Sequence, residues 1–348
     1  MTSAGNLRNV ALIGAGMVAR THVAAIAGAG LRLGAIVGRG RARAEALAQE
    51  AEALTGAPVA LRSLAQVAAD PGIDFAIVAT PPDARLSVIA PLIAAGKPIL
   101  LEKPVGRSLA EARAVVAACA AAGVPLGVVF QHRMRAASRR AAALVASGRL
   151  GALGLAEIAV PWWRAQAYYD EPGRGTHARD GGGVLISQAI HTIDLALSLA
   201  GPVARVSAMT ATTRFHSMET EDFAVAGLHF ANGAVGSLVA STASFPGAAE
   251  SITLHFERAS LRLASGLCHV QWRDGGDETH GQEAGTGGGA DPMGFTHHWH
   301  QGILEDFVAA LDEGRAPVAS GAAALAAHAL IDAITVSDRT GQPQEVPA

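Results

Sequence analysis

The chain has 348 residues, of which 50% are hydrophobic and 16% are charged, and its formal net charge at pH 7 is −3. This composition excludes a disordered chain, and the lack of a basic block argues against nucleic acid or an anionic membrane surface as a partner. Two distant cysteines, Cys119 and Cys268, exclude a disulfide framework. We expect two domains, no membrane span, no export signal in residues 1–8 and a cytoplasmic protein.

Apolar runs alternate with helix-forming runs in the first part of the chain. The expected strands are Val10–Ile13, Leu33–Val37, Phe75–Ala79, Ile99–Leu101 and Leu126–Phe130, and the expected helices are Arg20–Ala29, Arg41–Ala53, Leu86–Ala95 and Leu109–Ala122. This alternation predicts an α/β domain with a parallel, doubly wound sheet. We place that domain at residues 1–130.

The pattern changes after Gln131, where strand-like runs follow one another with little helix between them. The expected helices are Ser138–Ser147, Val184–Leu199, Trp299–Glu313 and Ala322–Arg339. The expected strands are Leu155–Val160, Val203–Met209, Phe223–Phe230, Ala234–Thr242, Ile252–Phe256 and Ser260–Leu263, and the polar stretch Asp274–Pro292 is expected to be a loop. Residues 131–348 therefore predict a second, α+β domain with a mostly antiparallel sheet.

The first expected strand leads directly into a G-x-G-x-x-A motif, residues Gly14 to Ala19, which opens the first helix. Gly14 permits a tight turn, Gly16 lets the backbone approach a pyrophosphate, and the small Ala19 lets helix and strand pack closely. The first helical turn offers N–H groups to the phosphates, and Met17 and Val18 of the motif are expected to contact the cofactor. A purely structural turn is the alternative, but the position between a strand and a helix favours dinucleotide binding.

Four segments in order along the chain resemble the Gfo/Idh/MocA family of NAD(P)-dependent sugar and cyclitol dehydrogenases. They are the Gly14 loop with His22, Thr80-Pro81-Pro82, Glu102-Lys103-Pro104, and the segment from Asp180-Gly181-Gly182-Gly183 through Gln188 and His191 to Asp194. The resemblance implies a Rossmann domain followed by a domain whose open sheet commonly supports homo-oligomers. It also implies that the Thr80 segment lines the nicotinamide side.

Lys103 lies at the end of a buried strand, on the sheet edge where ligands bind in such folds. A solvated lysine is the alternative. The resemblance implies that Lys103 reaches the nicotinamide ribose and the substrate hydroxyl, where its cation would favour a developing alkoxide. The peptide bond to Pro104 is often cis in the family. One departure is Arg85, which stands near a position where family members often carry histidine.

His191 lies on an otherwise apolar helix, four residues after Ser187, so the two share a face. A core histidine held by a hydrogen bond and a general base are the two interpretations. The resemblance implies the base. Inositol- and glucose-type members often have Asp where this chain has Ser187, and a hydroxyl can only orient or relay, which leaves the substrate class open. Asp194 is interpreted as a packing or hydrogen-bonding residue, with a replacement carboxylate as the alternative.

Aromatic and arginine residues precede the glycines. These residues are expected to line the site of a hydroxylated substrate, and a packed inter-domain loop is the alternative. They are Arg164, Tyr168, Tyr169 and Arg174. The two arginines could bind a carboxylate, so an acidic sugar stays open. The segment also resembles subfamilies that act on sugar nucleotides.

The second expected strand ends in Gly38-Arg39, where an NAD site usually carries Asp or Glu for the ribose hydroxyl. Arg39 could bind a 2′-phosphate, so NADP is favoured over NAD, and a basic helix turn facing solvent is the alternative. His297-His298-Trp299-His300 lacks an evident Asp, Glu or Cys partner set, so we expect no metal.

The chain is therefore predicted to be an enzyme that transfers hydride between NADP or NAD and the hydroxyl or carbonyl carbon of a sugar, cyclitol, uronate or sugar-nucleotide-like substrate. His191 would be the base and Lys103 would polarise the oxygen. A cofactor-binding regulator or sensor without turnover is the alternative, and a tightly held, recycled cofactor is a further one. The expected cofactor-binding residues are Gly14, Gly16, Met17, Val18, Gly38, Arg39, Thr80, Pro81, Pro82, Glu102 and Lys103, and the expected substrate-side residues are Arg164, Tyr168, Arg174, Ser187 and Gln188.

Overall fold

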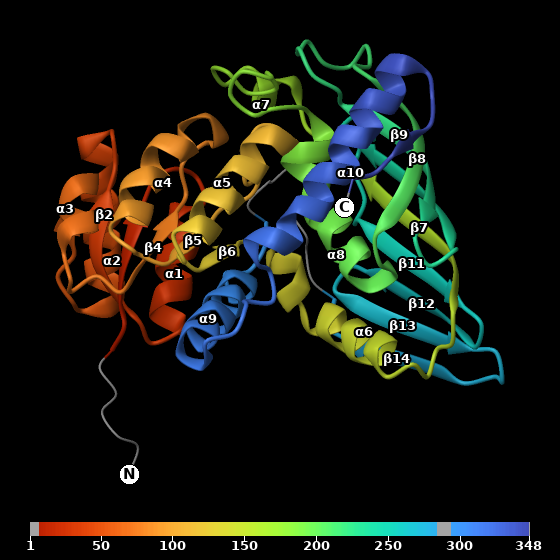
Figure 1. Ribbon diagram of the computed structural model, residues 1–348, viewed down its shortest axis with the longest axis horizontal. Helices are drawn as coiled ribbons and strands as arrows, with labels where there is room; N and C mark the ends of the chain where they lie inside the picture. The colour runs from red at the N-terminus through yellow and green to blue at the C-terminus, as the bar shows by residue number, and fades with distance from the viewer. Residues whose placement is uncertain (1–6, 284–293, 348) are drawn as a thin grey trace. The chain divides into compact units, whose positions relative to one another are not determined.

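The computed structural model describes residues 7–283 and 294–347, which fold as two compact units (Figure 1). The first unit comprises the N-terminal region through Gly106, together with Ala110–Gln131 and Thr296–Ala323. The second comprises Arg107–Leu109, His132–Phe295 and Ala324–Ala348. Residues 296–323 thus return to the first unit after the chain has formed the second, a return that the sequence pattern does not indicate.

A six-stranded parallel sheet forms the centre of the first unit. Its strands are β1 (Asn9–Ile13), β2 (Arg32–Val37), β3 (Ala60–Leu61), β4 (Phe75–Val78), β5 (Ile99–Leu101) and β6 (Leu126–Val128), in the order β3-β2-β1-β4-β5-β6. Its helices are α1 (Ala19–Gly28), α2 (Arg41–Thr55), α3 (Leu64–Ala69), α4 (Arg85–Ala94), α5 (Leu109–Ala121) and α9 (His298–Glu313). This strand order is that of doubly wound dinucleotide-binding sheets, so the predicted fold is confirmed.

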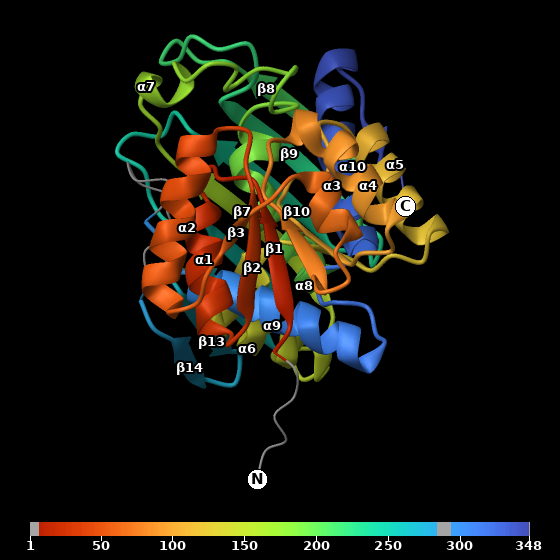
Figure 2. The same ribbon diagram turned by 90° about the vertical axis from the view of Figure 1, so that its left-hand side faces the viewer.

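Burial on both faces explains why these strands have continuous apolar sequences. Helices α1 and α2 lie on one face and α4 and α5 on the other (Figure 2), while α9 packs against α1. All residues of β4 and β5 are buried, as expected for a covered parallel sheet. The short elements β3 and α3 escape sequence analysis because two and six residues carry too little periodicity.

The second unit is built on a nine-stranded mixed sheet, in the order β14-β13-β12-β11-β7-β10-β9-β8-β15. The strands are β7 (Leu153–Pro161), β8 (Val203–Ala211), β9 (Phe223–Phe230), β10 (Val235–Ser241), β11 (Ser251–Phe256), β12 (Ala259–Ala264), β13 (Leu267–Trp272), β14 (Asp277–Gly281) and β15 (Gln344–Glu345). Only β7 and β10 pair in parallel, so the predicted mostly antiparallel sheet is confirmed.

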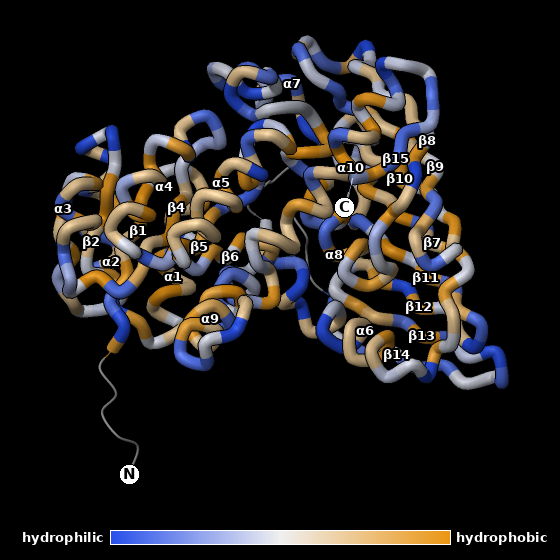
Figure 3. Tube along the Cα trace, viewed as in Figure 1, coloured by the Kyte–Doolittle hydropathy of each residue, from blue (hydrophilic) through white to orange (hydrophobic). Residues whose placement is uncertain are grey.

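Helices cover one face of this sheet. They are α6 (Ala136–Ala146), α8 (Ile190–Ala200) and α10 (Gly321–Thr340), of which α6 and α8 pack directly on the strands, whereas the short α7 (Gln166–Tyr169) lies in the connection after β7. Figure 3 shows apolar residues along the strands and these helices. Every second residue of β9 is buried, from Ala224 to Phe230, which is the alternation of a sheet covered on one face. No helix in residues 7–283 or 294–347 is long and apolar enough to cross a membrane.

Two expectations in this unit are corrected. Asp277–Gly281 was expected to be part of a loop but forms β14, a polar strand at the edge of the sheet that the described residues form, where charged side chains are tolerated. Residues 284–292 of that expected loop lie outside the described residues. The helix expected over Val184–Leu199 begins as a π-helical turn, η3 (Leu185–Ala189), and becomes α-helical only at Ile190.

Candidate active site

The Gly14 loop shows one glycine required by the fold and one that is not. Gly14 has a φ of +113°, and a Cβ there would lie 2.6 Å from the Ala79 carbonyl oxygen, so only glycine fits. A Cβ at Gly16 would meet no atom within 4 Å. Helix α1 begins just beyond, with Val18 as its N-cap and no side chain capping it. Open space beside an uncapped helix N-terminus fits the pyrophosphate of a dinucleotide.

The ends of β4 and β5 are joined by a buried arginine. Arg85, 2% exposed, donates to the carbonyl oxygens of Thr80 at 3.2 Å and Lys103 at 3.1 Å, and also to that of Glu102. Burial lowers the pKa of Arg85 to about 9, and the Glu102 carboxylate opposes this shift. The sequence marked this arginine only as a departure from the family, although it holds together two segments of the predicted site.

The segment Thr80-Pro81-Pro82 follows β4 and leads into a short 3-10 turn at Pro82–Ala84. The Thr80 hydroxyl oxygen is buried, yet it has no hydrogen-bond partner among residues 7–283 and 294–347. Buried hydroxyls are nearly always paired, so this oxygen is a candidate to contact a ligand.

Lys103 is half-buried, and its neighbour Glu102 points away from solvent. Glu102 Oε1 lies 2.9 Å from His22 Nε2 and 3.7 Å from His300 Nε2, while Oε2 accepts from the Lys103 backbone N–H at 3.2 Å. Burial alone would raise the pKa of Glu102, but hydrogen bonds from the two histidines hold it well below its usual range. The peptide bond from Lys103 to Pro104 is cis. Glu102 therefore holds the backbone of Lys103.

The histidine-rich segment has an acidic partner that the sequence does not reveal. His300 does have partners, because its ligand atom and those of His22 and Glu102 all lie within 4.8 Å of one another. The three groups come from α9, α1 and the residue after β5, and the sequence separation hides their proximity. Burial is the main cause that lowers the pKa of His300. A neutral imidazole beside an ionised carboxylate satisfies the cluster by hydrogen bonding, so the absence of a metal stays a prediction.

The glycine run before His191 lets two backbone segments come close. A Cβ at Gly181 would lie 2.2 Å from the Arg107 carbonyl oxygen, and one at Gly183 would lie 1.8 Å from that of Glu221. The Glu221 carboxylate accepts from the Gly183 N–H at 2.9 Å and the Leu185 N–H at 3.1 Å, at the start of the helical segment. Glu221, which sequence reasoning missed, thus satisfies N–H groups at the start of this helix.

His191 is 6% exposed and stacks on His132, with the ring centroids 4.9 Å apart and the planes tilted by 27°. Asp194 makes two hydrogen bonds of 2.7 Å with the Arg133 guanidinium. Burial raises the pKa of Asp194 and Arg133 opposes the rise. Both oxygens of Asp194 are thus engaged by Arg133, which favours the hydrogen-bonding interpretation of this residue over that of a replacement carboxylate.

Ser187 and Gln188 lie in the π-helical turn, a feature that often marks functional sites. Gln188 Nε2 donates to the Tyr168 hydroxyl at 3.3 Å, and its buried Oε1 has no partner in the described chain. The Tyr168 ring lies under two guanidinium groups, at 4.1 Å from Arg174 and 5.7 Å from Arg164. Four of the five expected substrate-side residues therefore form one cluster.

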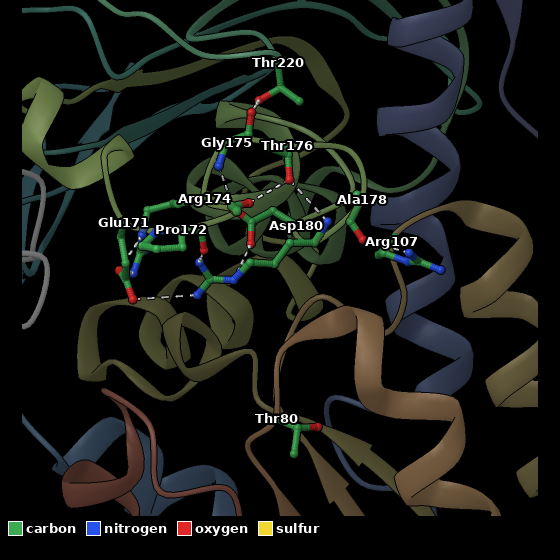
Figure 4. Close-up of polar contacts among 12 residues, drawn as sticks. Thr80, Arg107, Glu171, Pro172, Arg174, Gly175, Thr176, Ala178, Asp180 and Thr220 are labelled. Carbon is green, nitrogen blue, oxygen red and sulfur yellow. Dashed lines mark hydrogen bonds and ion pairs between the residues drawn. The ribbon is translucent and has the colours of Figure 1, made fainter. Parts of the chain in front are cut away.

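Hydrogen bonds and an ion pair among polar groups stabilise the loop over residues 171–180, which carries Arg174 (Figure 4). Arg174 pairs with Glu171, so its charge is already balanced. Asp180 accepts from the Gly175 N–H at 2.8 Å, and the Thr220 hydroxyl donates to the Gly175 carbonyl at 3.0 Å. Tyr169, by contrast, is buried, and its hydroxyl lies 2.6 Å from that of Thr242.

Beyond β2, Gly38 and Arg39 lie where a cofactor ribose is expected. The Arg39 side chain is exposed and contacts no carboxylate of the described residues, whereas Arg41 pairs with Glu45 at 2.7 Å. A Cβ at Gly38 would lie 3.0 Å from the Ala44 Cβ. An acidic side chain at this position would therefore require α2 to shift.

Comparison with known proteins adds three findings. A family model described as an oxidoreductase family with an NAD-binding Rossmann fold matches residues 8–130, and the GFO/IDH/MocA C-terminal domain model matches residues 138–262. D-apiose dehydrogenase of Paraburkholderia graminis is 28% identical over 351 residues, covering 97% of this chain and 89% of that protein.

Solved structures agree with these matches. The WlbA dehydrogenase from Bordetella pertussis, in complex with NADH and UDP-GlcNAcA, is 30% identical, with a TM-score of 0.80 and coverage of 99% of this chain and 100% of that one. Levoglucosan dehydrogenase, in complex with NADH and levoglucosan, is 23% identical with a TM-score of 0.84, over 99% of this chain and 100% of that one, and shares the fold.

Proposed function

Since this chain belongs to the Gfo/Idh/MocA family of oxidoreductases, we propose that it oxidises a carbon-bound hydroxyl of a sugar or sugar derivative with a nicotinamide cofactor, or runs the reverse reduction. The observation that carries the proposal is the edge of the first unit's sheet. There the open space at Gly16, the unpartnered Thr80 hydroxyl and Lys103 follow β1, β4 and β5. Ligands of doubly wound sheets bind beyond these strand ends.

We assign two roles to ionisable side chains. His191 removes the hydroxyl proton of the substrate as the hydride leaves the same carbon, and Lys103 donates a hydrogen bond to that oxygen. A nicotinamide cofactor, when bound, supplies the hydride acceptor. The carbon loses a hydride and the oxygen a proton, so alcohol becomes carbonyl and the reaction balances. Glu102 and Arg85 hold the backbone of Lys103 while this occurs.

We propose NADP as the preferred cofactor. Two observations support this choice. The Arg39 side chain is exposed and contacts no carboxylate of the described residues, so it is available to pair with a 2′-phosphate, and no acidic side chain directly follows β2 to accept from a ribose hydroxyl. Met17, Val18, Pro81 and Pro82 are proposed to complete the cofactor contacts. NADH is the cofactor named in the two solved complexes described above, so NAD is the outcome that would contradict this choice.

For the substrate, we propose a polyhydroxylated ring that rests against Tyr168 and Gln188. The unpartnered Gln188 Oε1 suits a hydroxyl donor, and the Tyr168 ring suits an apolar sugar face. The guanidinium groups of Arg164 and Arg174 both lie on the Tyr168 ring, so both are candidates to contact an acidic substituent, and Arg174 would share its charge with Glu171. Cyclitols, uronates and sugar nucleotides remain within this class.

We also propose that the protein self-associates through the sheet of its second unit. Val239 of β10 pairs with Val225 of β9, which pairs with Met209 of β8, so these residues form one row across the sheet. Val239 is 39% and Met209 is 52% exposed. A row of exposed apolar side chains is typical of a face that another subunit covers.

The function is tested by screening alcohols for NAD(P)H formation, with D-apiose, levoglucosan, myo-inositol, glucuronate and UDP-GlcNAcA as the panel. We expect turnover with at least one, and a loss of about 100-fold or more in kcat in His191→Ala and Lys103→Met. Arg32→Met, at an exposed position at the start of β2, is the control and should keep wild-type activity. Binding of NADPH or NADH without turnover of any panel member would instead support the sensor alternative.

A further inference from the structure

Two buried imidazoles stack in the second unit, and one of them is not part of the predicted site. His132, 3% exposed, comes from the short 3-10 turn Gln131–Met134 that follows β6, whereas His191 comes from α8. Their ring centroids are 4.9 Å apart. The sequence gives no sign of this pairing, because 59 positions separate the two residues and neither α-helical nor β periodicity relates them.

The tautomer of His132 follows from its hydrogen bond to an arginine. Arg135 Nη2 lies 2.6 Å from His132 Nε2. A guanidinium has donors only, so Nε2 must accept, and a neutral His132 must carry its proton on Nδ1. Protonating Nε2 would break this hydrogen bond and bring two cations together, so the contact favours a ring that carries its proton on Nδ1.

Arg135 is itself fixed by buried partners. Its Nη1 donates to Glu250 Oε1 at 2.5 Å, and Glu250 Oε2 accepts from Trp162 Nε1 at 3.2 Å. Arg135 is 8%, Glu250 4% and Trp162 5% exposed, so solvent screens this network little. Breaking such a pair would leave an uncompensated buried charge, which makes the geometry costly to distort.

We propose that His132 is a positioning residue for His191, and that the Trp162–Glu250–Arg135 network holds the plane of the His132 ring on which His191 stacks. This inference rests on the proposed function, in which His191 is the base. Position 187 carries a hydroxyl, and the Asp194 carboxylate is held by Arg133. A stacked neutral ring orients the base without adding a negative charge, in place of the carboxylate that a Ser187 site lacks.

The first test is independent of activity. In protein with 15N-labelled histidines, the His132 signals are assigned by their absence in His132→Asn. We expect the long-range nitrogen–proton pattern of a neutral ring with Nδ1 protonated and Nε2 unprotonated. An Nε2-protonated or cationic His132 would overturn the inference. In Arg135→Met we expect this tautomer preference to weaken, and an unchanged pattern would also overturn it.

The second test separates positioning from folding. Asn at position 132 can still accept from Arg135 but has no ring, whereas Phe keeps a ring. With the most active panel alcohol, we expect His132→Asn to lower kcat about 10-fold or more while KM stays within about twofold. Misplacing a reacting group by about 1 Å can cost about 100-fold, so a smaller displacement of His191 suffices for this loss. His132→Phe should recover part of the loss. Wild-type kcat in His132→Asn would contradict the inference.

Two comparisons keep the proposals distinguishable. If His191→Ala retains turnover, the proposed base is wrong whatever His132 does. If His191→Ala is inactive but His132→Asn is fully active, only the positioning role fails. Should His132→Asn not fold, as judged by its unfolding transition in urea, the His132 signals are assigned instead by their absence in His132→Phe. The tautomer measured in the wild-type protein then decides.

Discussion

Replacing Arg85 by methionine tests the account of how the two strand ends are held. Methionine is similar in length but cannot donate, so the carbonyl oxygens of Thr80, Glu102 and Lys103 lose the guanidinium. A buried acceptor left without its donor costs about 1–3 kcal/mol. Taking the lower value for each of three carbonyls gives about 3 kcal/mol of lost stability in the first unit. Affinity for NADPH and NADH should fall as well, because Thr80 and Lys103 are proposed cofactor contacts.

The assay is urea unfolding followed by intrinsic fluorescence, paired with titration of NADPH and NADH fluorescence. Arg85→Lys keeps a cation that can reach some of the carbonyls, so it should lose less than Arg85→Met. Arg32→Met, at an exposed position of β2, is the matched control and should stay within about 0.5 kcal/mol of wild type. An Arg85→Met protein with unchanged unfolding midpoint and cofactor affinity would refute the reasoning.

Three further predictions concern the first unit. Gly14→Ala should destabilise it by about 1–3 kcal/mol, because alanine is strained at the positive φ of this position. Gly16→Ala should leave the urea midpoint unchanged but weaken NADPH binding. If the two variants lowered the urea midpoint equally, the described loop geometry would be contradicted. The pKa of His300 lies below its ordinary 6.5 and that of Glu102 below 4.5, so both bind fewer protons when folded. The free energy of unfolding should therefore fall as the pH drops below 6.5, because His300 binds a proton more readily in the unfolded chain, and should fall again below pH 4.5 for the same reason at Glu102. A urea midpoint that stays constant as the pH is lowered from above 6.5 to below 4.5 would contradict this prediction. Arg39→Ala should weaken NADPH binding about 10-fold and NADH binding little; equal losses would exclude a 2′-phosphate contact.

The order of the main elements could be predicted because, in most helices and strands, apolar residues recur with the period of that element. The runs from Val10 to Val128 alternate as βαβ units do, and the parallel sheet follows from that alternation. β14 could not be predicted, since the charged segment Asp277–Gly281 lacks an apolar face. The return of α9 to the first unit depends on packing against α1, which no local pattern shows.

The residues of the candidate site also fall into those that the local sequence reveals and those that only the fold reveals. Gly14, Lys103 and His191 could be singled out because each stands in a motif or at a strand end with known chemistry. Arg85, Glu221 and His132 could not, since their partners are backbone groups or rings distant in sequence. The signal available for Arg85 was a charge directly before the apolar run Leu86 to Leu92, because an arginine buried at the start of such a helix needs several acceptors.

The central claim is that hydride passes directly from a substrate carbon to the nicotinamide while His191 takes the hydroxyl proton. The most direct measurement follows a panel alcohol deuterated at its reacting carbon, with the reduced cofactor analysed by mass spectrometry and proton NMR. The account predicts one deuterium at nicotinamide C4 of every reduced cofactor formed by the wild-type enzyme, and loss of turnover in His191→Ala. Reduced cofactor without deuterium, or full turnover in His191→Ala, would contradict it.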